Sequence, residues 1–232
     1  MLIAGFPAGS WATNCYVVAS GPGEPCLIID PGQDSIDGVQ EILREHRLLP
    51  AAVLLTHGHI DHVWSVAPVT SQFEIPALIH GDDRYRLADP AGSSFSAARE
   101  QLLAMTKNSL ELTDPADVRM FVDGEQLDIA GVQMTVRHAP GHTEGSSVFV
   151  TSEVMISGDL LFAGSIGRTD LPGGDHAQMI SSLQRVVLPA EDSLVVLPGH
   201  GPQTTIGDEK ASNPFLRPLM DGQSVPANPK GL

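Results

Sequence analysis

Histidines follow apolar segments at three points of the chain. The segment 57–62, which reads His-Gly-His-Ile-Asp-His, is separated by one residue, Thr56, from the apolar run 51–55, and His142 and His200 each follow a glycine. A carboxylate, Asp159, stands in a similar place after another apolar run. Neutral imidazole and carboxylate groups are the ligands that zinc, iron and manganese accept in proteins. These residues therefore predict a metal site assembled at the ends of strands.

The number of these side chains indicates two metal ions, because they exceed what one tetrahedral ion binds. They suit two ions that share one bridging carboxylate. His57 and His59, separated by one residue in a loop, can point to one side, whereas Asp61 and His62 lie where the next helix begins. We assign His57, His59 and His142 to site 1, assign Asp61, His62 and His200 to site 2, and make Asp159 the bridging ligand.

Such a pair of ions would carry out hydrolysis. Two cations roughly 3.5–4 Å apart polarise a bridging water and stabilise both oxygens of a displacement. Binding lowers the pKa of the water toward roughly 7 and so gives hydroxide at neutral pH. Asp61 is expected to orient this hydroxide. A catalytic site is favoured over a structural one because no cysteine closes the ligand shell. The expected cofactors are two divalent metal ions, with zinc favoured and iron or manganese as alternatives.

Two further residues are candidates for orienting the ligands. A metal-binding histidine needs a partner for its other ring nitrogen, and His138, four residues before His142, is placed to provide one. Asp30, in the segment Ile-Asp-Pro-Gly, either does the same or sets a turn.

The elements that must position these residues alternate in type. The N-terminus reads as a first strand, a helical spacing follows over 35–47 with Ser35 as its cap, and another helix is predicted within 82–106. A helix over 177–187 precedes the buried strand 193–197. The two halves of the chain have a similar order of elements, which predicts an α/β sandwich with helices covering sheet faces. Other strands are predicted at 14–19, 26–29, 51–55, 77–79, 132–136, 147–150 and 154–156.

Size and composition fit one folded domain. The 232 residues, 42% of them apolar, can bury a sizeable core, so we expect a single domain over 1–216 and a poorly ordered tail over 217–232. A net charge of −15 disfavours nucleic acid and anionic membranes as partners. No membrane-spanning run and no basic leader are visible, so the cytoplasm is the expected compartment. Cys15 and Cys26 lie in apolar contexts and are expected to be buried free thiols.

These motifs resemble those of the metallo-β-lactamase superfamily over nearly the whole chain, from Leu2 to about Leu216. The resemblance implies a four-layer αββα sandwich with its metal site at one edge of the two sheets. The seven ligands assigned above match the dinuclear pattern of the superfamily position by position. Asp159 stands where many true β-lactamases of this fold carry cysteine, which disfavours hydrolysis of antibiotics.

Within this superfamily the chain is similar to the glyoxalase II group, in particular to short bacterial members. The strings 158–170 and 197–207 carry this similarity. The implied reaction is hydrolysis of a 2-hydroxyacyl thioester, such as S-lactoylglutathione, and the implied partner is this small molecule. The longer enzymes have a C-terminal helical domain that binds glutathione, and we expect this domain to be absent here. Arg168 and Asp170 stand where those enzymes carry Lys and Tyr. Arg168 either binds a substrate carboxylate or pairs locally with Asp170 or Asp175.

Three other functions are weighed against thioester hydrolysis. A mononuclear iron persulfide dioxygenase of the same fold shares the 57–62 motif and a string like Gly-Arg-Thr-Asp at 167–170. A nuclease of this fold is disfavoured by the acidic charge and by the lack of an inserted nucleic-acid-binding domain. A catalytically inert binding protein is disfavoured because all seven ligands are present. Metal identity and oligomeric state do not follow from the sequence.

Overall fold

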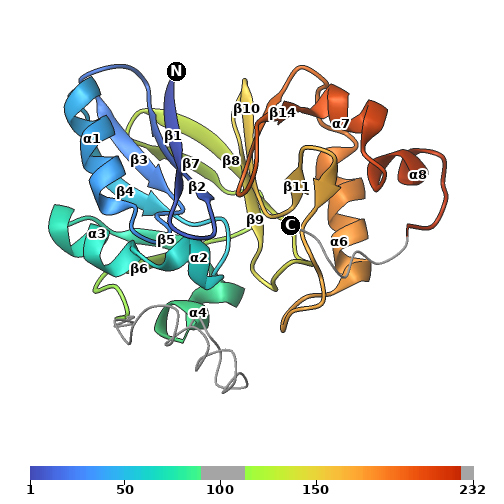
Figure 1. Ribbon diagram of the computed structural model, residues 1–232, viewed down its shortest axis with the longest axis horizontal. Helices are drawn as coiled ribbons and strands as arrows, with labels where there is room; N and C mark the ends of the chain where they lie inside the picture. The colour runs from blue at the N-terminus through green and yellow to red at the C-terminus, as the bar shows by residue number, and fades with distance from the viewer. Residues whose placement is uncertain (90–112, 226–232) are drawn as a thin grey trace.

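Two six-stranded β-sheets face each other in a computed structural model that describes residues 1–89 and 113–225 (Figure 1). The N-terminal sheet contains β1 to β6, and the C-terminal sheet contains β7 to β10 with β13 and β14. Helices cover the outer face of each sheet, as the apolar clusters described below show. The predicted four-layer αββα sandwich is therefore confirmed.

The N-terminal sheet follows the order of the chain. Strands β1 to β3 are antiparallel, and β3 to β6 run parallel to one another. The strands are β1 (Leu2–Ala8), β2 (Thr13–Ala19), β3 (Pro25–Ile29), β4 (Leu49–Leu54), β5 (Ala77–His80) and β6 (Val118–Phe121). The helical segments of this half are α1 (Ile36–His46), α2 (Ile60–Val63), α3 (Val66–Phe73), the 3-10 turn η1 (Gly81–Asp83) and α4 (Arg84–Ala88).

The C-terminal sheet has the order β14-β13-β10-β9-β8-β7, and only its β10–β13 pair is parallel. Its strands are β7 (Gln126–Ile129), β8 (Val132–His138), β9 (Ser147–Val150), β10 (Val154–Gly158), β13 (Val195–Pro198) and β14 (Thr204–Thr205), with a separate hairpin of β11 (Leu161–Phe162) and β12 (Ser165–Ile166). The helical segments are α6 (His176–Ser182), the π-helical η2 (Leu183–Val187), α7 (Ile206–Ser212) and α8 (Leu216–Met220).

Strand alternation produces three apolar layers. On β2, Val17 packs into the layer beneath α1 and α3, whereas Val18 packs into the layer between the two sheets. On β10, Ile156 faces the inter-sheet layer and Met155 faces the layer beneath α6. Because successive side chains of a strand point to opposite faces, strands that are covered on both faces read as continuous apolar runs.

Several predicted elements change in detail. Ser35 stands at the N-cap of α1, but its side chain makes no capping hydrogen bond. The helix expected within 82–106 appears as the short α4, and residues 90–112 lie outside the described part of the chain. The first residues of the expected tail form α8, and residues 226–232 also lie outside the described part.

Within the described ranges 1–89 and 113–225, no helix has the length and apolar character needed to cross a membrane.

Cys15 and Cys26 are both buried and unpaired, which confirms the expectation of buried free thiols. Burial raises the pKa of the Cys26 thiol to about 12.

Candidate metal centre

The predicted ligands lie on loops that follow strand ends of both sheets. The segment 57–62 leaves β4 and enters α2, which carries Asp61 and His62. His142 lies between β8 and β9, Asp159 directly follows β10, and His200 follows β13. A backbone bridge between Thr13 and His200 and a hydrogen bond from Ser147 N to Thr56 O join the two halves at this edge. The fold therefore brings all seven predicted ligands into one cluster.

The three predicted ligands of site 1 face one another. His59 Nδ1 and His142 Nε2 lie 2.8 Å apart, too close for both atoms to carry hydrogen. The ring of His57 has its centroid 4.9 Å from that of His59 and 4.8 Å from that of His142. One nitrogen from each ring lies within 4.8 Å of the other two. These three imidazoles can hold one metal ion.

The three predicted ligands of site 2 form a second group. His200 Nε2 lies 3.0 Å from Asp61 Oδ2, and His62 Nε2 lies 3.5 Å from the same oxygen. Their potential ligand atoms also lie within 4.8 Å of one another. A second ion can therefore be held beside the first.

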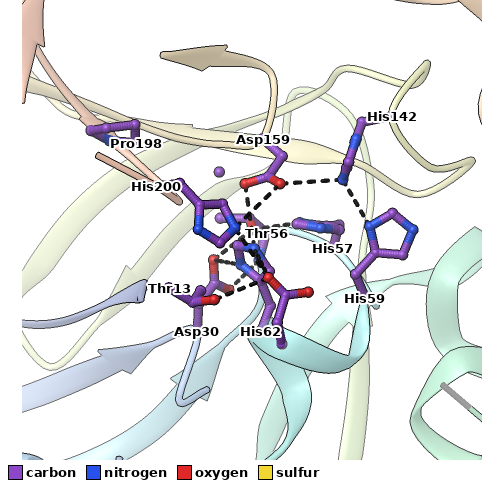
Figure 2. A network of polar contacts seen from close by, with 12 residues as sticks. Thr13, Asp30, Thr56, His57, His59, His62, His142, Asp159, Pro198 and His200 are labelled. Atoms are coloured by element: carbon purple, nitrogen blue, oxygen red, sulfur yellow. Dashed lines mark hydrogen bonds and ion pairs between the residues drawn. The ribbon is translucent and has the colours of Figure 1, made fainter. Parts of the chain in front are cut away.

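Asp159 stands between the two groups (Figure 2). Its Oδ2 lies 3.3 Å from His142 Nε2 and 3.7 Å from His200 Nε2. Its Oδ1 lies 3.3 Å from His62 Nε2. One carboxylate thus reaches a ligand of site 1 and two ligands of site 2, which is the placement that a bridging ligand needs.

Three buried polar atoms of this cluster indicate that a cation fits it. His57 Nε2, His62 Nε2 and Asp159 Oδ1 have no hydrogen-bond partner among the described residues. A buried polar atom without a partner costs about 1–3 kcal/mol. His62 Nε2 and Asp159 Oδ1 face each other at 3.3 Å without making a hydrogen bond. All three atoms belong to groups that ligate divalent cations, so an ion bound among them would supply the contact that no hydrogen bond provides.

The electrostatics differ between the two groups. Burial, followed by the nearby histidines, lowers the pKa of His57 and His59 well below the usual value. Burial alone would also lower the pKa of His62, but the carboxylates of Asp61 and Asp159 raise it well above that value. The imidazoles of His57 and His59 are consequently neutral and able to ligate at neutral pH, whereas a proton competes for His62.

Residues around the cluster fix the orientation of its rings. Asp30 accepts hydrogen bonds from Thr56 N (2.8 Å), Thr56 Oγ1 (2.6 Å) and His62 Nδ1 (2.9 Å). Thr56 Oγ1 also lies 3.1 Å from His57 Nδ1, and Thr13 Oγ1 donates to Asp61 Oδ2 over 3.0 Å. Asp30 therefore orients His62, as one of its two sequence interpretations proposed. The sequence did not predict that Thr56 and Thr13 orient ligands, although Thr56 immediately precedes His57.

His138 does not take the place that the sequence suggested. His142 Nδ1 instead contacts the Arg168 carbonyl oxygen over 2.8 Å, while His138 Nε2 contacts the Glu144 carbonyl oxygen. The ring of His138 stacks on that of His80 at 3.9 Å with an interplanar angle of 6°. Together with Asp82 these rings form another group with metal-binding atoms. One ion cannot lie in both ring planes of a parallel stack, so this group is not a preformed metal site.

Arg168 forms the local ion pair that was one of its two expected roles. Its Nε and Nη2 donate to the two carboxylate oxygens of Asp170 over 2.7 and 2.8 Å. Both side chains are partly exposed. The Arg168 carbonyl group holds His142, so this residue touches the cluster through its backbone.

Comparisons with known proteins agree with this geometry. The family model described as the metallo-β-lactamase superfamily matches residues 8–200. An uncharacterized protein of Mycobacterium tuberculosis is 42% identical over 226 residues, covering 94% of this chain and 99% of the relative. The hydroxyacylglutathione hydrolase GloC of Haemophilus influenzae is 35% identical over 212 residues, covering 90% of this chain and 95% of the relative.

Solved structures show the same fold. The B3 metallo-β-lactamase BLEG-1 is 35% identical and superposes with a TM-score of 0.78, covering 93% of this chain and 99% of its own. TTHA1623, solved in a di-iron-bound form, is 35% identical with a TM-score of 0.75 and coverages of 90% and 98%. ETHE1 from Myxococcus xanthus, at 20% identity and a TM-score of 0.73, shows the fold alone.

Members of this family are mostly metal-dependent hydrolases. The family match spans most of the chain, and the curated relatives align over nearly their whole length. The described His and Asp groups can hold metal ions. The chain belongs to the metallo-β-lactamase superfamily.

Proposed function

We propose that this protein is a dinuclear metal-dependent hydrolase of 2-hydroxyacyl thioesters, with S-lactoylglutathione as the model substrate. The observation that carries this proposal is the position of Asp159, whose two oxygens face ligands of both three-residue groups. A mononuclear centre would not need the complete second group. The likeness to a relative named hydroxyacylglutathione hydrolase supports the substrate class.

The residues present fit two divalent cations. His57, His59 and His142 would hold one, Asp61, His62 and His200 the other, and Asp159 would contact both. When bound, such cations polarise the thioester carbonyl group and lower the pKa of a water molecule. The nitrogen and oxygen donors suit zinc, which we propose as the metal, and iron or manganese would accept the same set.

Asp61 is the residue that we expect to guide the attacking water. Its Oδ2 is fixed by Thr13 and His200, so the carboxylate cannot rotate freely. Although burial opposes it, the neighbouring His62 and His200 hold the pKa of Asp61 far below its usual value, so the group is ionised and can accept a hydrogen bond from water. Water then adds to the acyl carbon, the C–S bond breaks, and the departing thiolate takes up a proton.

Arg168 is the candidate contact for the substrate. Its guanidinium group is partly exposed and already paired with Asp170. A substrate carboxylate, such as that of a glutathione moiety, would compete with Asp170 for the same two donors. An Arg168→Lys variant should then raise KM for S-lactoylglutathione several-fold and leave kcat nearly unchanged.

Metal analysis joined to an activity assay tests the proposal. We expect the purified full chain to hold two ions and to hydrolyse S-lactoylglutathione, with loss of the thioester absorbance. Asp159→Ala should remove at least one ion and most of the activity. Two bound ions without hydrolysis of any hydroxyacyl thioester would contradict the substrate class, and full metal content in Asp159→Ala would contradict the bridging role.

A persulfide dioxygenase is the second candidate, favoured by the Gly-Arg-Thr-Asp string at 167–170. This function predicts one iron per chain and oxygen uptake with glutathione persulfide. Because one similar structure carries the name of a B3 metallo-β-lactamase, a chromogenic β-lactam belongs in the same assay series. The number of ions, oxygen consumption and β-lactam turnover separate the three activities.

A further inference from the structure

A buried carboxylate outside the ligand set connects the two loops of site 1. Asp83, at the end of η1, is completely buried. Its Oδ2 accepts hydrogen bonds from Gly58 N over 2.8 Å and from Thr143 Oγ1 over 2.7 Å. Gly58 lies between His57 and His59, and Thr143 follows His142. One oxygen atom therefore bridges the two segments that carry the site 1 histidines.

The other oxygen of this carboxylate strengthens the same connection. Asp83 Oδ1 accepts from Gly145 N over 2.9 Å and lies 3.3 Å from Arg86 Nε. The Arg86 Nη2 donates to Glu144 Oε2 (2.7 Å) and to the Pro172 carbonyl oxygen (2.9 Å). A negative carboxylate surrounded by three donors and a guanidinium group is fully satisfied, so its buried charge is compensated.

The backbone approaches this carboxylate more closely than a side chain would permit. A Cβ atom at Gly145 would lie 2.6 Å from Asp83 N, and one at Gly58 would lie 2.6 Å from Arg86 Cβ. Glycines at these two positions let both loops pack directly on the Asp83–Arg86 pair. The pair therefore sets the position of each loop as well as its hydrogen bonding.

Site 2 is held by different residues. His62 is fixed by Asp30 and Asp61 by Thr13, while Asn14 anchors the segment before His200 through a hydrogen bond from its backbone N to Gly199 O. Within the described ranges, the polar contacts of Asp83 end on Gly58, Arg86, Thr143 and Gly145, and none of these flanks a site 2 ligand.

We propose that Asp83 is a positioning residue that sets the geometry of site 1 by joining the His57–His59 loop to the His142 loop. This inference rests on the proposed metal-binding function, but it does not depend on which substrate is hydrolysed. Asp83→Asn keeps the shape of the side chain and replaces one acceptor oxygen by an NH₂ group that faces donors. The ion at site 1 should then bind more weakly by roughly 10- to 100-fold, as for other groups that orient ligands.

The test measures Zn²⁺ affinity separately for each site, by competition with a chromogenic chelator in the full chain. In a His200→Ala background, which retains the three histidines of site 1, Asp83→Asn should weaken Zn²⁺ binding by this factor. In a His59→Ala background, which retains site 2, the same substitution should change the affinity by less than about threefold. Equal effects in the two backgrounds, or none in either, would overturn the proposal.

Glu209 provides a matched control for the loss of a buried carboxylate. It is also buried and accepts hydrogen bonds from Gly164 N, Thr204 Oγ1 and Asn213 Nδ2. Glu209→Gln should lower thermal stability without changing either Zn²⁺ affinity, and a selective loss at site 1 in this variant would refute the role of Asp83. If Asp83→Asn does not fold, Thr143→Val, which removes one donor to Asp83, should show the same selectivity with a smaller effect.

The outcomes for the two proposals are separable. Wild-type protein that binds two ions but does not cleave thioesters would disprove the proposed substrate, and the Zn²⁺ comparison would still decide the role of Asp83. Suppose instead that the wild-type protein cleaves thioesters, but Asp83→Asn leaves the Zn²⁺ affinity of both the His200→Ala and the His59→Ala protein unchanged. The proposed hydrolase function would then stand, and the positioning role of Asp83 would be rejected.

Discussion

Single residues around the cluster orient the predicted metal ligands through hydrogen bonds. Asp30 adopts a left-handed backbone conformation, with φ at 48°, and its carboxylate binds both Thr56 and His62. Its hydrogen bond to His62 Nδ1 leaves Nε2 free to face the second site. Because Thr56 in turn contacts His57, one carboxylate orients a histidine of each site.

This arrangement gives a prediction for Asp30→Asn. Asparagine tolerates the left-handed conformation and has the same shape, so the fold should be retained. Its NH₂ group cannot accept a hydrogen bond, so either Thr56 or His62 loses its partner. Metal affinity should fall by roughly 10- to 100-fold, measured by chelator competition. Unchanged affinity, with circular dichroism like that of the wild type, would show that Asp30 only sets a turn.

Protonation of the ligand histidines predicts the order in which the two ions are lost as pH falls. Burial and the nearby histidines lower the pKa of His57 and His59, so protons compete for these two ligands of site 1 only at low pH. The raised pKa of His62 lets protons compete at site 2 at higher pH. As pH falls, the ion at site 2 should dissociate first, beginning above the usual histidine pKa of roughly 6.5, and the ion at site 1 should dissociate only below it. Activity should fall when the first ion is lost.

Metal content after dialysis at a series of pH values checks this order. His200→Ala protein, which retains the site 1 histidines, should keep its ion to lower pH than His59→Ala protein, which retains site 2. The reverse order, or wild-type activity that stays flat down to about pH 5, would contradict the assignment of the two sites.

At the scale of the elements, the strands position the metal ligands by ending shortly before them. The ligands follow strands that are visible in the sequence, as apolar runs in β4, β10 and β13 and as an apolar–polar alternation in β8. The ligands and their strands could therefore be predicted. The turn after β13 must also leave room for the side chains of these ligands. A Cβ atom at Gly199 would lie 2.2 Å from Asp159 Oδ1 and 2.7 Å from His62 Cε1. This turn is therefore packed directly against the cluster.

A Gly199→Ala substitution should damage the centre without removing any ligand. The added methyl group must displace Asp159 or His62, and a shift of about 1 Å can cost roughly 100-fold in rate. We expect activity to fall by about this factor and metal content to drop below two ions. Gly21→Ala is the control, because a Cβ atom at Gly21 meets nothing within 4 Å. Equal activities of the two variants would contradict the close packing.

Elements without an extended pattern were not predictable. The two-residue strands β11, β12 and β14 are too short to show a period, whereas a helix start at Asp61 and His62 was expected and is α2. Asp83, Thr13 and Asn14 carry no signal in their own segments, because their partners lie far away along the chain. Local motifs therefore identified the ligands, whereas the residues that hold them required the tertiary structure. His138 was misplaced for the same reason, since the partner of His142 is a distant carbonyl group.

On the scale of the whole molecule, the centre lies where the two halves meet. Asn14 and Tyr16 of β2 bond to the Pro198–Gly201 segment of the other half, and Ser147 bonds to Thr56. Site 2 draws Asp61 and His62 from the first half and His200 from the second. An ion bound there would add a further link between two halves that already share these hydrogen bonds and the inter-sheet apolar layer.

Metal removal should therefore lower the stability of the entire fold. A ligand that binds only the native state adds about 4 kcal/mol when its concentration is a thousandfold above its Kd. For a chain of this size each kcal/mol changes Tm by about 2–4 °C, so chelation should lower Tm by roughly 8–16 °C. Scanning calorimetry with and without chelator measures this shift, and added Zn²⁺ should reverse it. Asp159→Ala protein, which lacks the bridging carboxylate, should respond less to the same chelator. An unchanged Tm in the wild type would mean that the two halves are held together without the ions.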